Sequence, residues 1–404
     1  MSALPSSLRV MRGRTQIATL DWTAIGTAYQ YSKSFLAKQP GPREGIGFAH
    51  PPHPDRVEHG PIHPFFANLL PEGPRQQRLA ESLGIRPDDA FGWLAAMGGS
   101  STGDVWAQAE DASPAKETKL ELPDRFLFHN LREQIRQAKE HATQNIAGVH
   151  AKLTNLRIGT DPQTVGKVPY GFGGSPAILK FGSPETPHLA ENEAFFMDLA
   201  KRAGFKTAKN CVLRDASGES ALLVIRFDRG PRGLRIHQED ACQLRGLHPT
   251  EKYDVSLREV VEAFQRVCAS PMAAALEVVA QAAFAYLVGN TDLHAKNFSV
   301  LVSPKTGLVE PSPVYDVVST LLYPPHEARM ALAMDGRDAN LAREHFLAFA
   351  ERFGVRRPAL EARLSAMTAV MPGCLDRILD LPFDPRTLKR WRDEARLRTE
   401  ALSA

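Results

Sequence analysis

The feature that most constrains the fold is a change in the sequence pattern along the chain, from segments typical of strands to segments typical of helices. Before residue 228, short apolar runs such as 177–181 alternate with stretches rich in Gly and Pro, which is typical of strands joined by turns. Four helices are predicted among them, over residues 75–83, 88–97, 126–141 and 191–203, the last of which lies between strands. From Leu257 onward the pattern is mostly helical. We therefore predict an α+β fold with a β-rich N-terminal lobe and a mostly helical C-terminal lobe.

The 404 residues are enough for two or more compact parts, and we expect three: 1–110, 111–235 and 236–404. Residues 108–122 are polar and are predicted to be a linker, and 159–176 a loop. The net charge is +3, from 49 basic and 46 acidic residues, which excludes a protein that coats nucleic acid through many uncompensated cations.

The four cysteines lie far apart with no Cys-x-x-Cys pair, so we expect no zinc or redox motif. The apolar stretch 272–288 is interrupted by Glu277 and Gln281 and is predicted to be a buried helix. The first twenty residues contain no apolar run of signal-peptide length. We therefore expect a cytoplasmic protein that does not contact a membrane.

The strongest local signal is Asp292-Leu293-His294-Ala295-Lys296-Asn297. An Asp followed five residues later by an Asn matches the catalytic loop of protein kinases. In that loop the Asp accepts the proton of the attacking hydroxyl, and the Asn holds a metal ion on the phosphates. The alternative is a turn rich in Asp and Asn with ordinary capping hydrogen bonds.

A second carboxylate, Asp316, follows Asn297 by nineteen residues. Two short predicted strands, joined by a turn at 304–307, separate the two residues and would bring them side by side. Mg²⁺ prefers oxygen ligands and keeps several waters, so one Asp, one Asn and phosphate oxygens suffice. The Phe-Gly that follows this Asp in most protein kinases is missing, and the alternative role is a helix N-cap.

Two further segments fit the same chemistry. Lys180 lies in the apolar strand 177–181, and Glu191 or Glu193 on the next helix could pair with it, as a strand lysine and a helix glutamate do in kinases. Spacing does not decide between the two glutamates, and Lys180 could instead extend its ammonium group to solvent. The small-residue segment 145–152 could present backbone N–H groups to phosphates, or could be an ordinary turn. Together with the order of elements, these segments favour a two-lobed, protein-kinase-like fold.

Taken together, the segments resemble the HipA family, the serine/threonine kinase toxins of bacterial toxin–antitoxin modules. The resemblance covers nearly the whole chain. It is carried by Phe66-Ala67-Asn68-Leu69-Leu70-Pro71-Glu72-Gly73, Ile146-Ala147-Gly148-Val149-His150-Ala151-Lys152-Leu153, Glu191-Asn192-Glu193, Arg226-Phe227-Asp228-Arg229, Gln238-Glu239-Asp240, Asp292-Leu293-His294-Ala295-Lys296-Asn297-Phe298 and Tyr315-Asp316-Val317.

The resemblance implies a role for individual residues. Asp292 would be the catalytic base, with Asn297 and Asp316 as ligands of Mg²⁺, and Glu193 would be the ion-pair partner of Lys180. The residues implied to contact ATP are Ala147, Gly148, Val149, His150, Lys152, Lys180, Ile225, Arg226, Phe227 and His294. Residues 225–227 would be the hinge that contacts adenine through backbone groups.

The resemblance also implies substrates and partners. Family members phosphorylate proteins, with aminoacyl-tRNA synthetases as known targets, which inhibits translation and growth and is linked to persistence. They commonly bind a HipB-like helix-turn-helix antitoxin, so DNA would be contacted only indirectly, through the antitoxin.

Three positions depart from the family pattern. Asn145 stands where members often carry a Ser whose autophosphorylation turns the kinase off, and Thr143 is the nearest substitute acceptor. Ile225 stands where the hinge often has Glu, and His150 where Gln is common. These departures concern autoregulation rather than catalysis.

Two other functions are compatible with parts of the pattern. Aminoglycoside and choline kinases share the Asp-x-His-x-x-Asn motif, so a small-molecule kinase is the first alternative. A non-catalytic DNA corepressor bound to an antitoxin is the second, and the residues Asp292, Asn297, Asp316 and Lys180 argue against it. The basic segments 389–392 and 396–398 could touch DNA phosphates or form a solvated helix face.

Overall fold

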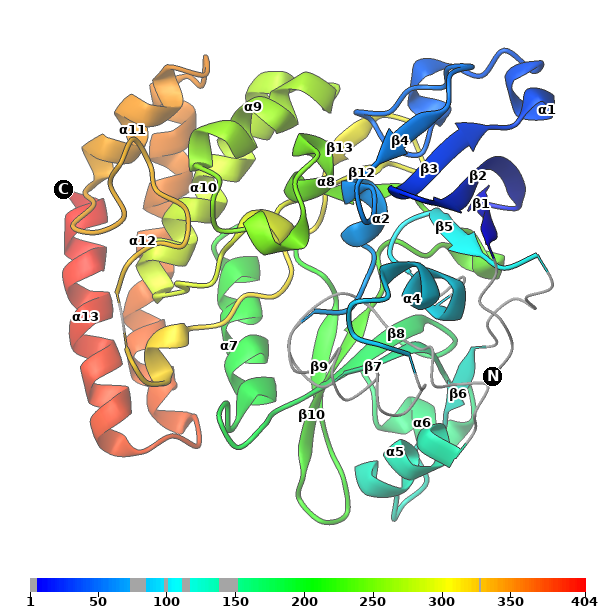
Figure 1. The fold of residues 1–404 in the computed structure, drawn as a ribbon. Coiled ribbons are helices and arrows are strands. Elements are labelled where there is room, and N and C mark those ends of the chain that lie inside the picture. Colours follow the sequence, from blue (N-terminus) through cyan, green and yellow to red (C-terminus); the bar gives the residue numbers. More distant parts are fainter. Residues whose placement is uncertain (1–5, 73–84, 98–100, 111–116, 138–151, 327) are drawn as a thin grey trace. The chain divides into compact units, whose positions relative to one another are not determined.

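The computed structural model describes residues 6–72, 85–97, 101–110, 117–137, 152–326 and 328–404. The chain divides into two compact units. Unit 1 comprises Met1–Lys180, Leu213–Glu219 and Ile225–Pro249, and unit 2 comprises Phe181–Val212, Ser220–Val224 and Thr250–Ala404. Strands predominate in the N-terminal part and helices in the C-terminal part, which confirms the predicted α+β class (Figure 1).

An antiparallel sheet of five strands, in the order β4-β3-β2-β1-β5, forms the beginning of unit 1 (Figure 1). The strands are β1 (Ser7–Arg12), β2 (Thr15–Thr23), β3 (Gly26–Tyr31), β4 (Val57–His59) and β5 (Val105–Gln108). Alternation along β1 turns Leu8 and Val10 into the core, where they are fully buried. Helices α1 (Lys33–Leu36), α2 (Pro64–Ala67) and α4 (Ala90–Met97) pack three large aromatic side chains into the same core, namely Phe35, Phe66 and Trp93.

Histidines gather beside this core. The ring of His63 lies 4.5 Å from that of His50 and 5.2 Å from those of His59 and Tyr29, measured between centroids. His63 is 5% exposed, and its Nδ1 accepts the N–H of Phe65 (3.2 Å) at the start of α2. Burial first, and then the neighbouring histidines His50, His59 and His248, lower the pKa of His63 to about 3.

This histidine predicts how stability depends on pH. In the unfolded chain His titrates near its ordinary pKa of about 6.5, whereas the folded His63 stays neutral down to about pH 3. Its stabilising effect is complete above the unfolded pKa and is lost as the pH falls toward the folded one. In urea unfolding, this site should lower the free energy of unfolding by about 2 kcal/mol when the pH falls from about 7 to about 5. His63→Asn, which keeps a capping side chain, should show a smaller decrease, and an equal decrease would contradict the assignment.

Unit 1 continues with β6 (Thr118–Leu120), α5 (Phe128–Gln137), β7 (Lys152–Ile158), α6 (Pro162–Gly166), most of β8 (Pro176–Phe181), β11 (Gln238–Asp240) and α8 (Ala241–Arg245). β7 pairs with β6 in parallel and with β8 in antiparallel register. Two predictions were incomplete. The linker 108–122 contains β6, and the loop 159–176 contains α6, which forms because Asp161 caps it by accepting the N–H of Thr164 (2.9 Å).

Unit 2 is built mainly from helices. They are α7 (Leu189–Arg202), α9 (Leu257–Val267), α10 (Pro271–Val288), α11 (Arg343–Glu351), α12 (Arg357–Arg377) and α13 (Pro385–Ser403). The unit also holds most of β9 (Asn210–Arg214) and of β10 (Ser220–Ile225), and all of β12 (Ser299–Val302) and β13 (Val309–Pro311). α10 is long and apolar enough to cross a membrane, but 67% of it is buried and it packs against α9, α11, α12 and α13. We therefore identify it as the core helix of unit 2.

The basic segments of the C-terminal helix α13 agree in part with the predicted solvated face, because Lys389, Arg390 and Arg396 are exposed, whereas two other side chains of these segments are buried. Trp391 is 1% exposed and donates its Nε1–H to the Val288 carbonyl (3.1 Å) and to Ser319 Oγ (2.8 Å). Arg398 is 4% exposed, bonds the carbonyls of Tyr286 and Ala328, and lies over the Tyr286 ring. These two side chains therefore fasten α13 to the core and cannot face DNA or solvent.

Candidate functional site

The candidate catalytic loop begins where α10 ends. Gly289 has a left-handed φ of 72°, and a Cβ atom there would come within 2.3 Å of Leu321 Cδ1, so the position requires glycine. Beyond it the Asp292 N–H donates to Asn290 Oδ1 (3.1 Å), and the Asp292 carbonyl accepts the N–H of His294 (2.8 Å). These bonds hold the half-buried side chain of Asp292 at the end of the core helix.

The predicted hairpin between Asn297 and Asp316 is present. β12 and β13 pair in antiparallel register, with Val300 opposite Pro311. At the base of the hairpin the Tyr315 hydroxyl donates to the Lys296 carbonyl (2.7 Å) and lies 2.5 Å from Ser299 Oγ. This clamp keeps Asp316 near the candidate catalytic loop. Burial lowers the pKa of His294 in that loop, and the charge of Asp316 offsets only part of this effect.

The backbone of Asp316 is unusual. Its φ is 60°, in the left-handed region that few residues other than Gly, Asn and Asp adopt. It is not a helix N-cap, because the following 3₁₀ helix, Thr320–Leu322, takes Ser319 as its cap residue. Strained backbone of this kind is concentrated at functional sites, which agrees with a role for the Asp316 carboxylate in binding.

A divalent cation fits the residues of this loop. Asn297 is 5% exposed, and within the described part of the chain its buried Oδ1 accepts no hydrogen bond. A buried amide oxygen without a donor is costly unless a ligand satisfies it. No cluster of three His, Cys, Asp or Glu side chains among the described residues could hold a metal ion. The candidate donors that the sequence predicts are one amide and one carboxylate oxygen, and Mg²⁺ completed by phosphate and water would accept such a set.

One residue of this site was missed from the sequence. The hydroxyl of Tyr253 donates to Asp292 Oδ1 at 2.5 Å, and the Tyr253 ring meets His294 edge-on with centroids 5.2 Å apart. Tyr253 is 47% exposed. It lies 39 residues before Asp292, in a segment without a recognised motif, so no sequence signal pointed to the contact.

A second set of missed residues fixes the segment after Asp316. Thr320 Oγ1 accepts the N–H of Thr291 (2.9 Å), and the Thr320 N–H donates to the Gly289 carbonyl (3.0 Å). Asn192 of α7 is fully buried and forms two hydrogen bonds with the Ser319 backbone, at 2.9 and 3.0 Å. The Asn of the Glu-Asn-Glu motif therefore anchors the site, whereas the sequence predicts a role only for the glutamates of this motif.

The two candidate lysines lie in unit 1. Lys180 in β8 is directly opposite Lys152 in β7, so both side chains project from the same face of the sheet. Lys180 is 9% exposed. Glu193 is 2% exposed and lies on α7 of unit 2, and its pairing with Lys180 stays a prediction.

The predicted hinge is joined to an ion cluster through Arg226. Asp228 is 4% exposed and accepts two bonds from Arg226 (2.9 and 2.6 Å), one from Arg229 (2.7 Å) and one from the Gly103 N–H (2.9 Å). Burial alone would raise the pKa of Asp228, but the two guanidinium groups hold it well below its usual range. The Arg226 N–H also donates to the Pro176 carbonyl (3.0 Å). The side chain and N–H of Arg226 thus have structural partners, and adenine could use neither without breaking these bonds.

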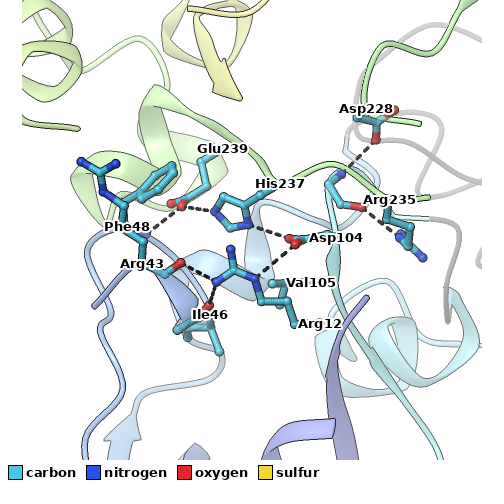
Figure 2. A network of polar contacts seen from close by, with 12 residues as sticks. Arg12, Arg43, Ile46, Phe48, Asp104, Val105, Asp228, Arg235, His237 and Glu239 are labelled. Atoms are coloured by element: carbon cyan, nitrogen blue, oxygen red, sulfur yellow. Dashed lines mark hydrogen bonds and ion pairs between the residues drawn. The ribbon is translucent and has the colours of Figure 1, made fainter. Parts of the chain in front are cut away.

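The cluster continues into a histidine flanked by two carboxylates (Figure 2). His237 Nδ1 lies 2.6 Å from Asp104, and its Nε2 lies 2.7 Å from Glu239. Burial would lower the pKa of His237, but these carboxylates raise it to about 9, so the ring is charged at neutral pH. Glu239 also accepts the N–H of Phe48 (2.7 Å), and Arg12 pairs with Asp104 (3.1 Å). The motif Gln-Glu-Asp at 238–240 therefore stabilises unit 1.

Several predicted site residues lie outside the described part of the chain. They are Thr143, Asn145, Ala147, Gly148, Val149 and His150. Their roles stay predictions, as do those of Ile225 and Phe227, which are half-buried in unit 1.

Comparison with known proteins adds family evidence to this geometry. Residues 144–374 match the family described as HipA-like C-terminal domain, and residues 8–108 match the HipA N-terminal domain. The serine/threonine-protein kinase toxin HipA of Shewanella oneidensis is 30% identical over 78% of this chain and 76% of its own length. Y4mE of Sinorhizobium fredii is also 30% identical, over 82% of this chain and 83% of its own.

A solved structure extends the likeness to the fold. The Shewanella oneidensis toxin–antitoxin complex of HipA, HipB and operator DNA contains a chain that superposes with a TM-score of 0.72 at 25% identity. The match covers 98% of this chain and 97% of that one. The sequence match to HipA and the structural match to the solved HipA chain both agree with the protein-kinase-like architecture predicted from the order of elements.

Proposed function

Because the chain belongs to the HipA family of serine/threonine-protein kinases, we propose that it transfers the γ-phosphoryl group of ATP to a protein hydroxyl with Asp292 as the general base. The observation that carries this assignment is the arrangement of Asp292, Asn297 and Asp316 on one loop and the hairpin that follows it. The base, in this reading, takes the proton of the acceptor hydroxyl, and the other two side chains face the phosphates.

Asn297 and Asp316 would hold Mg²⁺, which supplies charge neutralisation to the phosphates when bound. Two observations support this role: Asn297 Oδ1 accepts no hydrogen bond from the described residues, and the backbone of Asp316 is left-handed. His294 stays mostly neutral because burial lowers its pKa, so at neutral pH it can donate a hydrogen bond without adding charge.

Lys152 and Lys180 would bind the phosphates from unit 1. Two ammonium groups directly opposite each other in a ladder repel, and an anion between them offsets that repulsion. The segment 145–150, by the family resemblance, would cover the nucleotide, and residues 225–227 would meet adenine.

Substrate and partner are proposed from the family. The protein acceptor would be an aminoacyl-tRNA synthetase, whose modification inhibits translation and growth. A HipB-like helix-turn-helix antitoxin would be the partner, since the matched Shewanella structure is a complex of HipA with HipB and operator DNA. Such a protein would act in the cytoplasm and reach DNA only through the antitoxin.

One experiment tests the function directly. The purified protein is incubated with labelled Mg-ATP and a bacterial lysate depleted of endogenous kinases by heat, and phosphorylated proteins are mapped by mass spectrometry. We expect a small number of phosphorylated Ser or Thr sites, including one in an aminoacyl-tRNA synthetase. Labelling of small molecules alone would favour a small-molecule kinase, and no transfer at all would favour the non-catalytic corepressor.

Asp316→Ala should weaken the binding of Mg-ATP. The substitution removes one of two proposed protein ligands of the metal, so affinity should fall at least about tenfold, which corresponds to about 1.4 kcal/mol. Titration calorimetry with Mg-ATP measures this, with Asp335→Ala as a control because Asp335 also has a positive φ but pairs with Arg258 at the surface (3.1 Å). Unchanged affinity in Asp316→Ala would remove Asp316 from the metal site.

A further inference from the structure

Tyr253 occupies the place on Asp292 that an acceptor hydroxyl needs. A general base acts on a hydroxyl that lies within hydrogen-bond distance of it, with the proton directed at the carboxylate. The Tyr253 hydroxyl already has this relation, because it donates to Asp292 Oδ1 at 2.5 Å. Both residues belong to unit 2, so the contact lies within one compact unit.

We propose that Tyr253 is itself a phosphoacceptor of this kinase, modified within its own chain. The inference rests on the proposed role of Asp292 and adds to it a modification site. Other hydroxyls near the loop are engaged elsewhere. Thr291 Oγ1 and Thr320 Oγ1 bond each other (2.7 Å), and Tyr315 is held by Lys296 and Ser299. Of the hydroxyls in the described residues, that of Tyr253 alone has a hydrogen bond to Asp292.

The surroundings of Tyr253 suit an acceptor. Its side chain is 47% exposed, so the phenol can be approached from solvent. The ring is supported by two contacts, the edge of His294 and the Lys252 ammonium 5.4 Å from the ring centroid. The Lys252 carbonyl accepts the N–H of Ala295 (3.1 Å), which fixes the segment to the candidate catalytic loop. An acceptor whose position is fixed beside the base needs no separate binding step.

The transfer balances without another reactant. The phenolic oxygen forms a bond to the γ-phosphorus of ATP, the bond from that phosphorus to the β,γ-bridging oxygen breaks, and ADP leaves. The phenolic proton passes to the Asp292 carboxylate. The product carries about −1.5 to −2 charge and three acceptor oxygens next to Asp292. This charge repels the base and blocks the acceptor position, while the nearby Lys252 can pair with the phosphate. Self-modification would therefore slow the kinase.

The test is made on the full-length protein with Mg-ATP and no other acceptor. Intact mass and peptide mapping should find one phosphoryl group per chain, on Tyr253. Its rate of appearance should not depend on protein concentration, because acceptor and base share a chain. In a mixture, wild-type protein should leave Tyr253 of tagged Asp292→Asn chains unmodified.

Two variants, together with a parallel assay of transfer to lysate proteins, distinguish failure of this inference from failure of the proposed function. Tyr253→Phe should lose the phosphate, and its transfer to lysate proteins, measured relative to its own initial rate, should no longer decline during incubation with Mg-ATP as that of the wild type does. Tyr323→Phe is the control, since Tyr323 is a buried tyrosine of unit 2 whose hydroxyl accepts from Asn192 (3.2 Å) and donates to the Pro187 carbonyl (3.0 Å) rather than to Asp292. Phosphate on Thr143 alone, or an unmodified Tyr253 while lysate proteins become phosphorylated, would overturn this inference and leave the kinase assignment intact. Absence of transfer to every acceptor would instead overturn the proposed function.

Discussion

Asp292→Asn is expected to bind Mg-ATP as the wild type does and to transfer phosphate about 10²–10⁴-fold more slowly. The carboxylate acts on the acceptor proton and is not among the groups proposed to bind nucleotide. The Asn oxygen can still accept the hydrogen bond of the Tyr253 hydroxyl, so the loop should keep its shape. Initial rates of transfer to lysate proteins, together with calorimetric titration of Mg-ATP, measure the two quantities separately.

A matched control is Asp338→Asn, which removes a carboxylate of unit 2 that pairs with Arg329 (3.1 Å) and has no hydrogen bond to Asp292 in the described residues. It should change neither rate nor affinity. Transfer at the wild-type rate in Asp292→Asn would refute the assignment of the base. Loss of nucleotide binding together with activity would point to a structural role for Asp292.

The second large effect concerns stability. Asp228→Asn should lower the free energy of unfolding by about 3–5 kcal/mol, because it leaves buried guanidinium groups without their counter-charge. Three arginines, Arg226, Arg229 and Arg235, surround this one carboxylate. Burial, followed by repulsion from Arg226, already lowers the pKa of Arg229 to about 10. The Asn side chain has nearly the same volume, so the effect reports charge rather than a cavity.

Urea unfolding followed by tryptophan fluorescence measures this change, since Arg235 stacks 4.1 Å from the Trp106 ring. Asp88→Asn is the control, because Asp88 also makes a two-bond contact with an arginine, Arg86, but on the surface. Exposed pairs contribute little, so its midpoint should not shift measurably. A similar midpoint for both variants would mean that burial adds nothing to the cluster.

Much of the candidate catalytic loop was predictable because it is local in sequence. Asp292 and Asn297 lie five residues apart, and Asp316 is joined to them by a hairpin whose turn residues mark its position. The apolar stretch before them predicted α10 because a continuous apolar run is typical of a buried helix, and this signal is also local in sequence. Local spacing and apolar runs are therefore sufficient where a function is built from consecutive elements.

Contacts between distant segments could not be predicted in this way. Tyr253 reaches Asp292 across 39 residues, and Asn192 reaches Ser319 across 127. The sequence predicts a hinge at Arg226, and the structure uses its side chain in a buried ion cluster. Arg398 looked like part of a basic surface, but it is buried against Tyr286. In each case tertiary packing decides the role, and neither charge pattern nor periodicity records it.

The β12–β13 hairpin also makes the protein easy to modify at a chosen point. Pairing of Val300 with Pro311, and the clamp made by Tyr315, set the distance between Asn297 and Asp316, whatever the length of the turn. Lys305 and Thr306 lie exposed at the tip of that turn. Exposed tips tolerate inserted residues because no buried backbone group is disturbed. A peptide tag or a fluorescent reporter inserted between these two residues would therefore give a handle close to the candidate site in sequence, without altering the spacing of its ligands.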